Sequence, residues 1–95
     1  MSQGYVVGQM TVKNPEKWAE YRSQVLATLQ PFGGELVFRG HQAQVFSGLN
    51  THPDIVVICF PSLADAQGWH ASAAYQALIP LRQEAADVVL VNYAT

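Results

Sequence analysis

The chain has 95 residues, of which 49% are hydrophobic and 13% are charged, and its formal net charge is −2. This length predicts a single domain spanning residues 1–95, and the composition excludes a disordered protein. No run of Lys or Arg is present, which excludes nucleic acid as the expected partner, because phosphate binding needs a clustered basic face. The charged fraction is about half of the usual ~25%, so we expect part of the surface to be buried against a second copy.

Signals for membranes and export are missing from the sequence. No apolar stretch approaches the ~20 residues that span a bilayer. Residues 1–4 lack the basic-then-apolar pattern of a secretory signal. The single cysteine, Cys59, lies inside an apolar run, so a disulfide within the chain is impossible. We therefore expect a cytoplasmic protein that does not associate with a membrane.

The first half of the chain predicts a strand, a helix and a second strand. β-Branched residues and Tyr dominate residues 5–12, which predicts a strand. The Asn-Pro-Glu segment at 14–16 is a strong helix start, because Asn caps, Pro suits the first turn and an acid favours the positive end of the helix dipole. The helix is expected to end near Leu29, before the glycine-bearing turn at 31–34. A strand follows at 35–39.

The middle of the chain predicts a hairpin and a buried strand. Residues 43–47 continue the second strand, either as a hairpin arm or as the same strand after a bulge. After a polar loop comes the uninterrupted apolar run 55–60, which predicts a strand covered on both faces.

The last third predicts a broken helical region and a final strand. Ser62 opens a helix that runs to about Ala71, and Ser72 caps a second stretch. Pro80 is expected in the first turn of a further piece that ends near Ala86. Asp87 is expected to close the helical region, ahead of a strand at 88–93.

This order, β-α-β-β-α-β, predicts a ferredoxin-like α+β fold: a four-stranded antiparallel sheet with helices on one face. The strands at 55–60 and 88–93 carry apolar side chains on both faces. Leaving about six aliphatic side chains wet, at roughly 25 cal/mol per Å², would forfeit several kcal/mol. That loss is comparable with the ~5–15 kcal/mol stability of a domain. We therefore expect a homodimer that packs sheet against sheet.

A set of short motifs resembles a known family. The motifs are Tyr5–Met10, Pro15–Tyr21, Pro31–Gly34, Val37–Gly40, Phe60–Leu63, Trp69, Ser72, Tyr75–Gln76 and Pro80–Arg82. In order and spacing they are similar to domain of unknown function family 1330, within the dimeric α/β-barrel superfamily. The resemblance implies a ferredoxin-like fold and a dimer closed through the sheets. It implies no particular activity, since the superfamily includes cofactor-free monooxygenases, lactone isomerases, stress-response barrels and haem-binding branches.

Two of the five basic residues, Arg39 and Arg82, fall on motif positions of the resemblance. A guanidinium offers a fixed fork that grips a carboxylate or phosphate in two places. Each arginine has an alternative role in a surface ion pair, for example with Glu35 or Glu84. Both roles are left open by the sequence.

Aromatic residues at helical spacing usually belong to a core, and Trp18 is expected there. Tyr21 and Tyr75 are better candidates for a pocket wall, because a buried hydroxyl needs a hydrogen-bond partner. With Trp69 as an apolar wall, a pocket between the helices and the sheet would suit a small, flat, anionic or phenolic molecule.

His70 is a candidate general acid or base, because its unperturbed pKa is about 6.5. The alternative is an exposed helix histidine beside a buried Trp69, since adjacent helical positions point about 100° apart. His41 and His52 lie in other segments, without metal-ligand spacing, so no metal site or cofactor is expected. Haem ligation by a single histidine stays open.

Three functions follow as hypotheses. The first is a small-molecule pocket in a cofactor-free dimer, with Arg39 and Arg82 holding an anion, Tyr21 and Tyr75 donating hydrogen bonds, and His70 in reserve for proton transfer. Such an enzyme would isomerise or oxygenate a small organic compound, by analogy alone. The second is a non-catalytic metabolite-binding or stress-related dimer. The third is pure assembly, with the pocket filled by core side chains.

Overall fold

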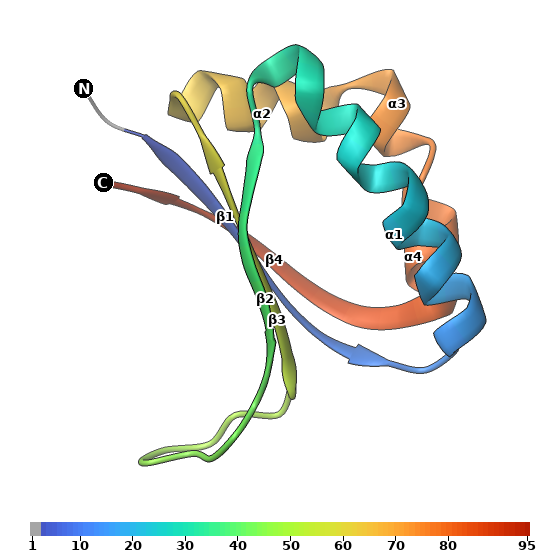
Figure 1. Cartoon of the computed structure of the whole chain (residues 1–95), viewed down its shortest axis with the longest axis vertical. Coiled ribbons are helices and arrows are strands. Elements are labelled where there is room, and N and C mark those ends of the chain that lie inside the picture. Colours follow the sequence, from blue (N-terminus) through green and yellow to red (C-terminus); the bar gives the residue numbers. More distant parts are fainter. Residues whose placement is uncertain (1–2) are drawn as a thin grey trace.

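The computed structural model describes residues 3–95. Its elements in chain order are β1 (Gly4–Val12), α1 (Pro15–Leu29), the 3-10 turn η1 (Gln30–Phe32), β2 (Glu35–His41), β3 (Asp54–Phe60), α2 (Leu63–Ala71), α3 (Ala73–Gln76), α4 (Ile79–Ala85) and β4 (Ala86–Ala94). The four strands form one sheet in the order β2-β3-β1-β4, and each neighbouring pair is antiparallel. The helices all lie on one side of this sheet (Figure 1). The predicted ferredoxin-like α+β fold is therefore confirmed.

The predicted helix starts are also confirmed, and those of α1, α2 and α3 are capped by a side chain. The Asn14 side chain accepts a hydrogen bond from the Lys17 amide at 3.1 Å, at the start of α1. Ser62 Oγ accepts from the Asp65 amide at 3.1 Å, at the start of α2. Ser72 opens α3, and a new piece with proline in its first turn follows as α4.

Two boundaries differ from the prediction. The bulge in β2 lies between Leu36 and Phe38, and residues 43–47 form no strand. β4 begins at Ala86, so Asp87 belongs to the strand and does not close the helical region. The physical reason is that β1 is long enough to extend the ladder, with Thr11 opposite Asp87 and Val12 opposite Ala86.

Residues 42–53 form an irregular arm that joins β2 to β3. It projects beyond the end of the sheet and bends away from the helices (Figure 1). The Gln42 amide donates to the Pro53 carbonyl at 2.6 Å, which closes the base of the arm. Near its tip the side chains of Phe46 and Leu49 are 90% and 93% exposed. Two large apolar side chains therefore have no cover within the described chain.

The core lies between the helices and the inner face of the sheet. Its largest fully buried side chains are Leu29, Phe60, Trp69 and Tyr75. The Trp69 ring packs on Phe60 and Tyr75, with ring centroids 5.5 and 4.2 Å away. The Trp69 indole Nε1–H donates to Thr28 Oγ1 at 2.9 Å. This bond joins α2 to α1 across the core.

Gly8, in the middle of β1, permits close packing beneath this core. A Cβ at that position would meet Val56 Cγ1 at 3.0 Å and Leu90 Cδ1 at 3.3 Å. The absence of a side chain at Gly8 thus lets Val56 and Leu90 approach the strand closely.

The outer face of the sheet has no cover within residues 3–95. The side chains at 56, 58 and 60 in β3 point toward the helices, whereas those at 55, 57 and 59 face outward. Phe38, Val89 and Val91 are exposed on the edge strands of the outer face. The expectation that 55–60 is covered on both faces is therefore not met within one chain, because the helices pack on one face only.

Across residues 3–95, the structure contains no helix with the length and apolar character needed to cross a membrane.

The Trp69–Thr28 hydrogen bond leads to a stability prediction. Thr28→Val keeps the shape of the side chain but leaves the buried indole N–H without an acceptor. We expect a loss of about 1–3 kcal/mol in the free energy of unfolding, measured by urea denaturation. Thr28→Ser is the matched control, because it keeps the hydroxyl and is expected to lose about 1 kcal/mol or less. Equal stability of Thr28→Val and wild type would contradict the assigned bond.

Candidate functional site

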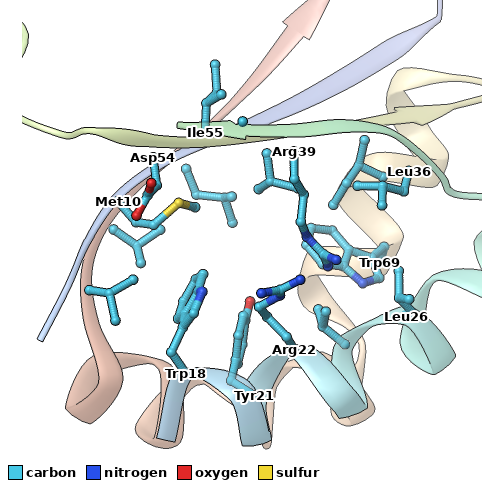
Figure 2. Close-up of a pocket in the computed structure, with 17 residues that line it drawn as sticks. Met10, Trp18, Tyr21, Arg22, Leu26, Leu36, Arg39, Asp54, Ile55 and Trp69 are labelled. Carbon is cyan, nitrogen blue, oxygen red and sulfur yellow. The ribbon is translucent and has the colours of Figure 1, made fainter. Parts of the chain in front are cut away.

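A cavity of about 360 Å³ lies between α1 and the inner face of the sheet. Figure 2 shows its lining, with α1 on one side and the strands on the other. Trp18, Tyr21, Arg22 and Val25 supply the α1 wall, and their spacing of three and four residues places them on one helix face. The rings of Trp18 and Tyr21 stack at 5.1 Å between centroids. Because these large side chains stand between helix and sheet, a cavity remains beside them.

The opposite wall comes from the sheet and is mostly apolar. Met10, Val56, Ile58 and Leu90 form its floor. Arg39 reaches in from the edge strand β2 (Figure 2). The cavity lining therefore combines an apolar floor with a charged side chain from the edge of the sheet.

Two guanidinium groups line the same cavity. Arg39 approaches from the sheet and Arg22 from α1, and in Figure 2 the Arg22 guanidinium lies beside the Tyr21 hydroxyl, with that of Arg39 nearer Trp69. Within residues 3–95 neither arginine forms an ion pair; the ion pairs there are Lys13–Asp87, Lys17–Glu84 and His41–Asp54. Partial burial lowers the pKa of Arg39, and the nearby Arg22 charge lowers it further. Two like charges thus converge without a counter-ion.

A series of hydrogen bonds joins Tyr21, beside the two arginines, to Tyr75 and Arg82. Tyr21 Oη lies 2.9 Å from Tyr75 Oη, and Arg82 Nη1 donates to Tyr75 Oη at 2.8 Å. Burial, and then the neighbouring Tyr75, raise the pKa of Tyr21 far above its ordinary value. Arg82 and Arg39 oppose this rise only partly. Tyr21 therefore stays protonated and serves as a hydrogen-bond donor, not as a base.

The structure brings Tyr21, Arg39 and Trp69 together as lining residues of the cavity. Tyr75 is fully buried behind Tyr21, and Arg82 lies behind Tyr75, so neither lines the cavity. The ion pair considered between Arg82 and Glu84 is absent, since Glu84 pairs with Lys17 at 2.9 Å.

His70 lies outside this cavity. It is exposed on α2, and it lines a separate hollow of about 300 Å³ together with Gln67 and Asn92. Its ring lies 5.5 Å from that of Tyr75, measured between centroids. The expected divergence of the adjacent Trp69 and His70 side chains is seen, although Trp69 touches both hollows.

Sequence reasoning missed Arg22, although positions 18, 21, 22 and 25 share one helix face. The expected core position of Trp18 is confirmed in part, because its side chain packs against the core and also lines the cavity. Asp54 was also missed. It lines the cavity, and its Oδ1 lies 2.6 Å from His41 Nδ1. Only the strand register, which sets His41 opposite Asp54, brings these two residues together.

No cluster of three or more His, Cys, Asp or Glu side chains suited to a metal ion occurs in residues 3–95.

Solved structures with a similar fold share little sequence with this chain. A protein of unknown function from Rhodopseudomonas palustris, RPA0582, is 17% identical with a TM-score of 0.79, over 97% of this chain and 81% of that one. SnoaB, a cofactor-independent oxygenase from Streptomyces nogalater, is 8% identical with a TM-score of 0.73, over 100% and 94%. A dimeric ferredoxin-like protein of unknown function from Thermobifida fusca is 13% identical with a TM-score of 0.61, over 99% and 92%. These similarities show the fold alone.

No curated protein matches the chain. The model of one family, described as a domain of unknown function (DUF1330), matches residues 3–93. That match covers nearly the whole chain and agrees with the motifs found in the sequence. The chain therefore belongs to the DUF1330 family.

Proposed function

We propose that the cavity beneath α1 binds a small planar organic anion, with a carboxylate as its charged group. The observation that supports this most is the pair Arg22 and Arg39, which line the cavity with no carboxylate partner in residues 3–95. Both side chains stay exposed in part, and the Arg22 charge lowers the pKa of Arg39, which indicates that the two like charges repel each other. A bound carboxylate would accept from both forks at once.

The rest of the cavity suits a flat, apolar body. Trp18, Tyr21 and Trp69 offer ring faces or edges, and Met10 adds a flexible thioether. Its volume of about 360 Å³ lies near the lower end of the ~300–1,000 Å³ that is common for small-molecule sites. Simple aromatic carboxylates therefore fit the lining chemistry.

Binding is favoured over catalysis by the polar groups that are present. Tyr21 stays protonated, and His70 lies in the separate hollow. One observation supports catalysis as a second candidate function. Asp54 lines the cavity and is paired with His41, so it is the group that would accept a proton in an isomerisation or cofactor-free oxygenation. The likeness to the SnoaB oxygenase concerns the fold only.

We propose in addition that the functional unit is a homodimer joined through the outer face of the sheet. This face presents one apolar row across the four strands, made of Phe38, Val57, Val7 and Val91. The arm bends toward the same side, with Phe46 and Leu49 exposed, so a second copy seated on the sheet would also meet the arm (Figure 1). The Thermobifida fusca protein of similar fold is dimeric.

Anion binding can be tested with benzoate as the probe. Replacing Arg39 or Arg22 with Met removes one charge-assisted hydrogen-bonding fork, which is worth about 1.5–3 kcal/mol. We therefore expect each variant to weaken benzoate binding about tenfold or more in isothermal titration calorimetry. Lys17→Met is the matched control, because it removes a positive charge from the same helix, and Lys17 pairs with Glu84 outside the cavity. Equal loss in all three variants would show that only net charge matters.

The dimer can be tested by sedimentation. At micromolar concentration we expect twice the 10.4 kDa mass of one chain. Val91→Lys places a charge on the outer face and is expected to give a monomer, because an unpaired charge is costly to bury. Gln24→Lys, on the exposed side of α1, is the control and should stay dimeric. A monomeric wild-type protein at this concentration would contradict the proposed assembly.

A further inference from the structure

We infer that the arginine end of the cavity offers its ligand hydrogen-bond donors only, and that Tyr75 and Arg82 act through Tyr21 to direct its hydroxyl hydrogen into the cavity. The inference rests on the proposed anion-binding function and specifies the chemistry of the ligand. The polar head must be an oxygen that carries no hydrogen, as in a carboxylate or an enolate. Tyr21 is then a specificity-determining residue, and Arg82 is a positioning residue.

The argument begins with the direction of the outer hydrogen bond. A guanidinium has no acceptor atom, so the 2.8 Å contact between Arg82 Nη1 and Tyr75 Oη has Arg82 as its donor. Tyr75 is 0% exposed, and the hydrogen-bond partners of its hydroxyl in residues 3–95 are Arg82 and Tyr21. The hydrogen of the Tyr75 hydroxyl therefore has one available acceptor, which is Tyr21 Oη.

The direction of the inner hydrogen bond follows from this. If Tyr21 donated to Tyr75, the Tyr75 hydrogen would be buried without an acceptor, a condition that native structures avoid. If Tyr75 donates to Tyr21 across their 2.9 Å contact, the Tyr75 hydroxyl hydrogen has an acceptor, and only the Tyr21 hydroxyl hydrogen is left without one. The second arrangement satisfies the fully buried Tyr75 hydroxyl and leaves only the Tyr21 hydrogen, at the cavity, without an acceptor.

The hydrogen of Tyr21 then has the cavity as its outlet. Tyr21 lines the cavity, and in Figure 2 its oxygen points inward beside Arg22. The neighbouring Arg22 and Arg39 cannot accept a hydrogen bond. The carboxylate that lines the cavity, Asp54, lies at the other end and contacts His41 at 2.6 Å. An acceptor for Tyr21 must therefore come from the ligand or from water.

Arg82 also strengthens the donor that it orients. A hydrogen bond from a cation polarises the Tyr75 hydroxyl, and successive bonds in such a chain reinforce one another. The raised pKa of Tyr21 agrees with a hydroxyl that keeps its hydrogen. Three donors on one side of the cavity would then discriminate a carboxylate from an amide of the same shape, because an amide NH₂ would face them without an acceptor.

The test compares benzoate with its neutral isostere benzamide by isothermal titration calorimetry. We expect wild type to prefer benzoate at least about tenfold. Tyr21→Phe should lower the benzoate affinity about tenfold and the benzamide affinity much less, so that the preference falls. Arg82→Met should reduce the preference in the same direction, and Arg82→Lys should restore it, because Lys also donates to Tyr75. A merely structural role of Arg82 would weaken both probes equally.

The outcomes separate this inference from the proposed function. If wild type fails to bind benzoate, or binds it equally well after Arg22→Met and Arg39→Met, the anion site and this inference both fall. If those two variants lose binding while Tyr21→Phe keeps the full preference for benzoate, this inference alone is overturned. Should Tyr21→Phe not fold, as judged by its thermal transition, the comparison of Arg82→Met with Arg82→Lys decides: an unchanged preference in Arg82→Met overturns the inference.

Discussion

The contact between Trp69 and α1 is the interaction on which both the core and the cavity depend. The Trp69 indole donates to Thr28 Oγ1 at 2.9 Å, and the ring packs on Phe60 and Tyr75. The same ring lines the cavity. The Trp69 side chain thus fixes the C-terminal end of α1 close to α2. Nearer the N-terminal end of α1, the Trp18 and Tyr21 side chains keep the helix away from the strands. The cavity follows from this packing, because bulky rings line the space that they hold open.

The distribution of positive charge is the basis of the proposed anion site. Of the five basic residues, Lys13 and Lys17 form exposed ion pairs, and Arg82 donates to Tyr75. The remaining two, Arg22 and Arg39, line the cavity without an ion pair in residues 3–95. A chain with so few charges places two of them side by side, where they repel each other. An anion at that point would remove the repulsion, which is why the charge pattern favours a binding pocket over a filled core.

The fold was predictable from the sequence because its signals are local. Asn14, Ser62 and Ser72 are helix caps, and the apolar runs at 55–60 and 88–93 are strands whatever their partners. The start of β4 and the bulge in β2 were not predictable, since they depend on how far each ladder extends along its neighbour. The outward-facing half of β3 is visible in the sequence as apolarity on both faces, and it is the basis for expecting a second copy.

The site was predictable only in part, for a related reason. Tyr21 and Arg39 could be named from residue type, but their neighbours depend on geometry between elements. Arg82 was expected to hold an anion together with Arg39. The structure instead places Tyr75 and Tyr21 between Arg82 and the cavity. Asp54 and His41 meet only through strand register. The pairing of Arg22 with Arg39 required knowing which face of α1 meets the edge of the sheet.

The central claim is that an anion binds between Arg22 and Arg39, and a crystal structure with 4-bromobenzoate tests it most directly. Anomalous scattering from bromine fixes the position and direction of the probe without interpretation of weak density. We predict a carboxylate in contact with both guanidinium groups and the Tyr21 hydroxyl, with bromine directed toward the apolar floor near Met10. Bromine located only outside this cavity, or a carboxylate turned away from both arginines, would contradict the account.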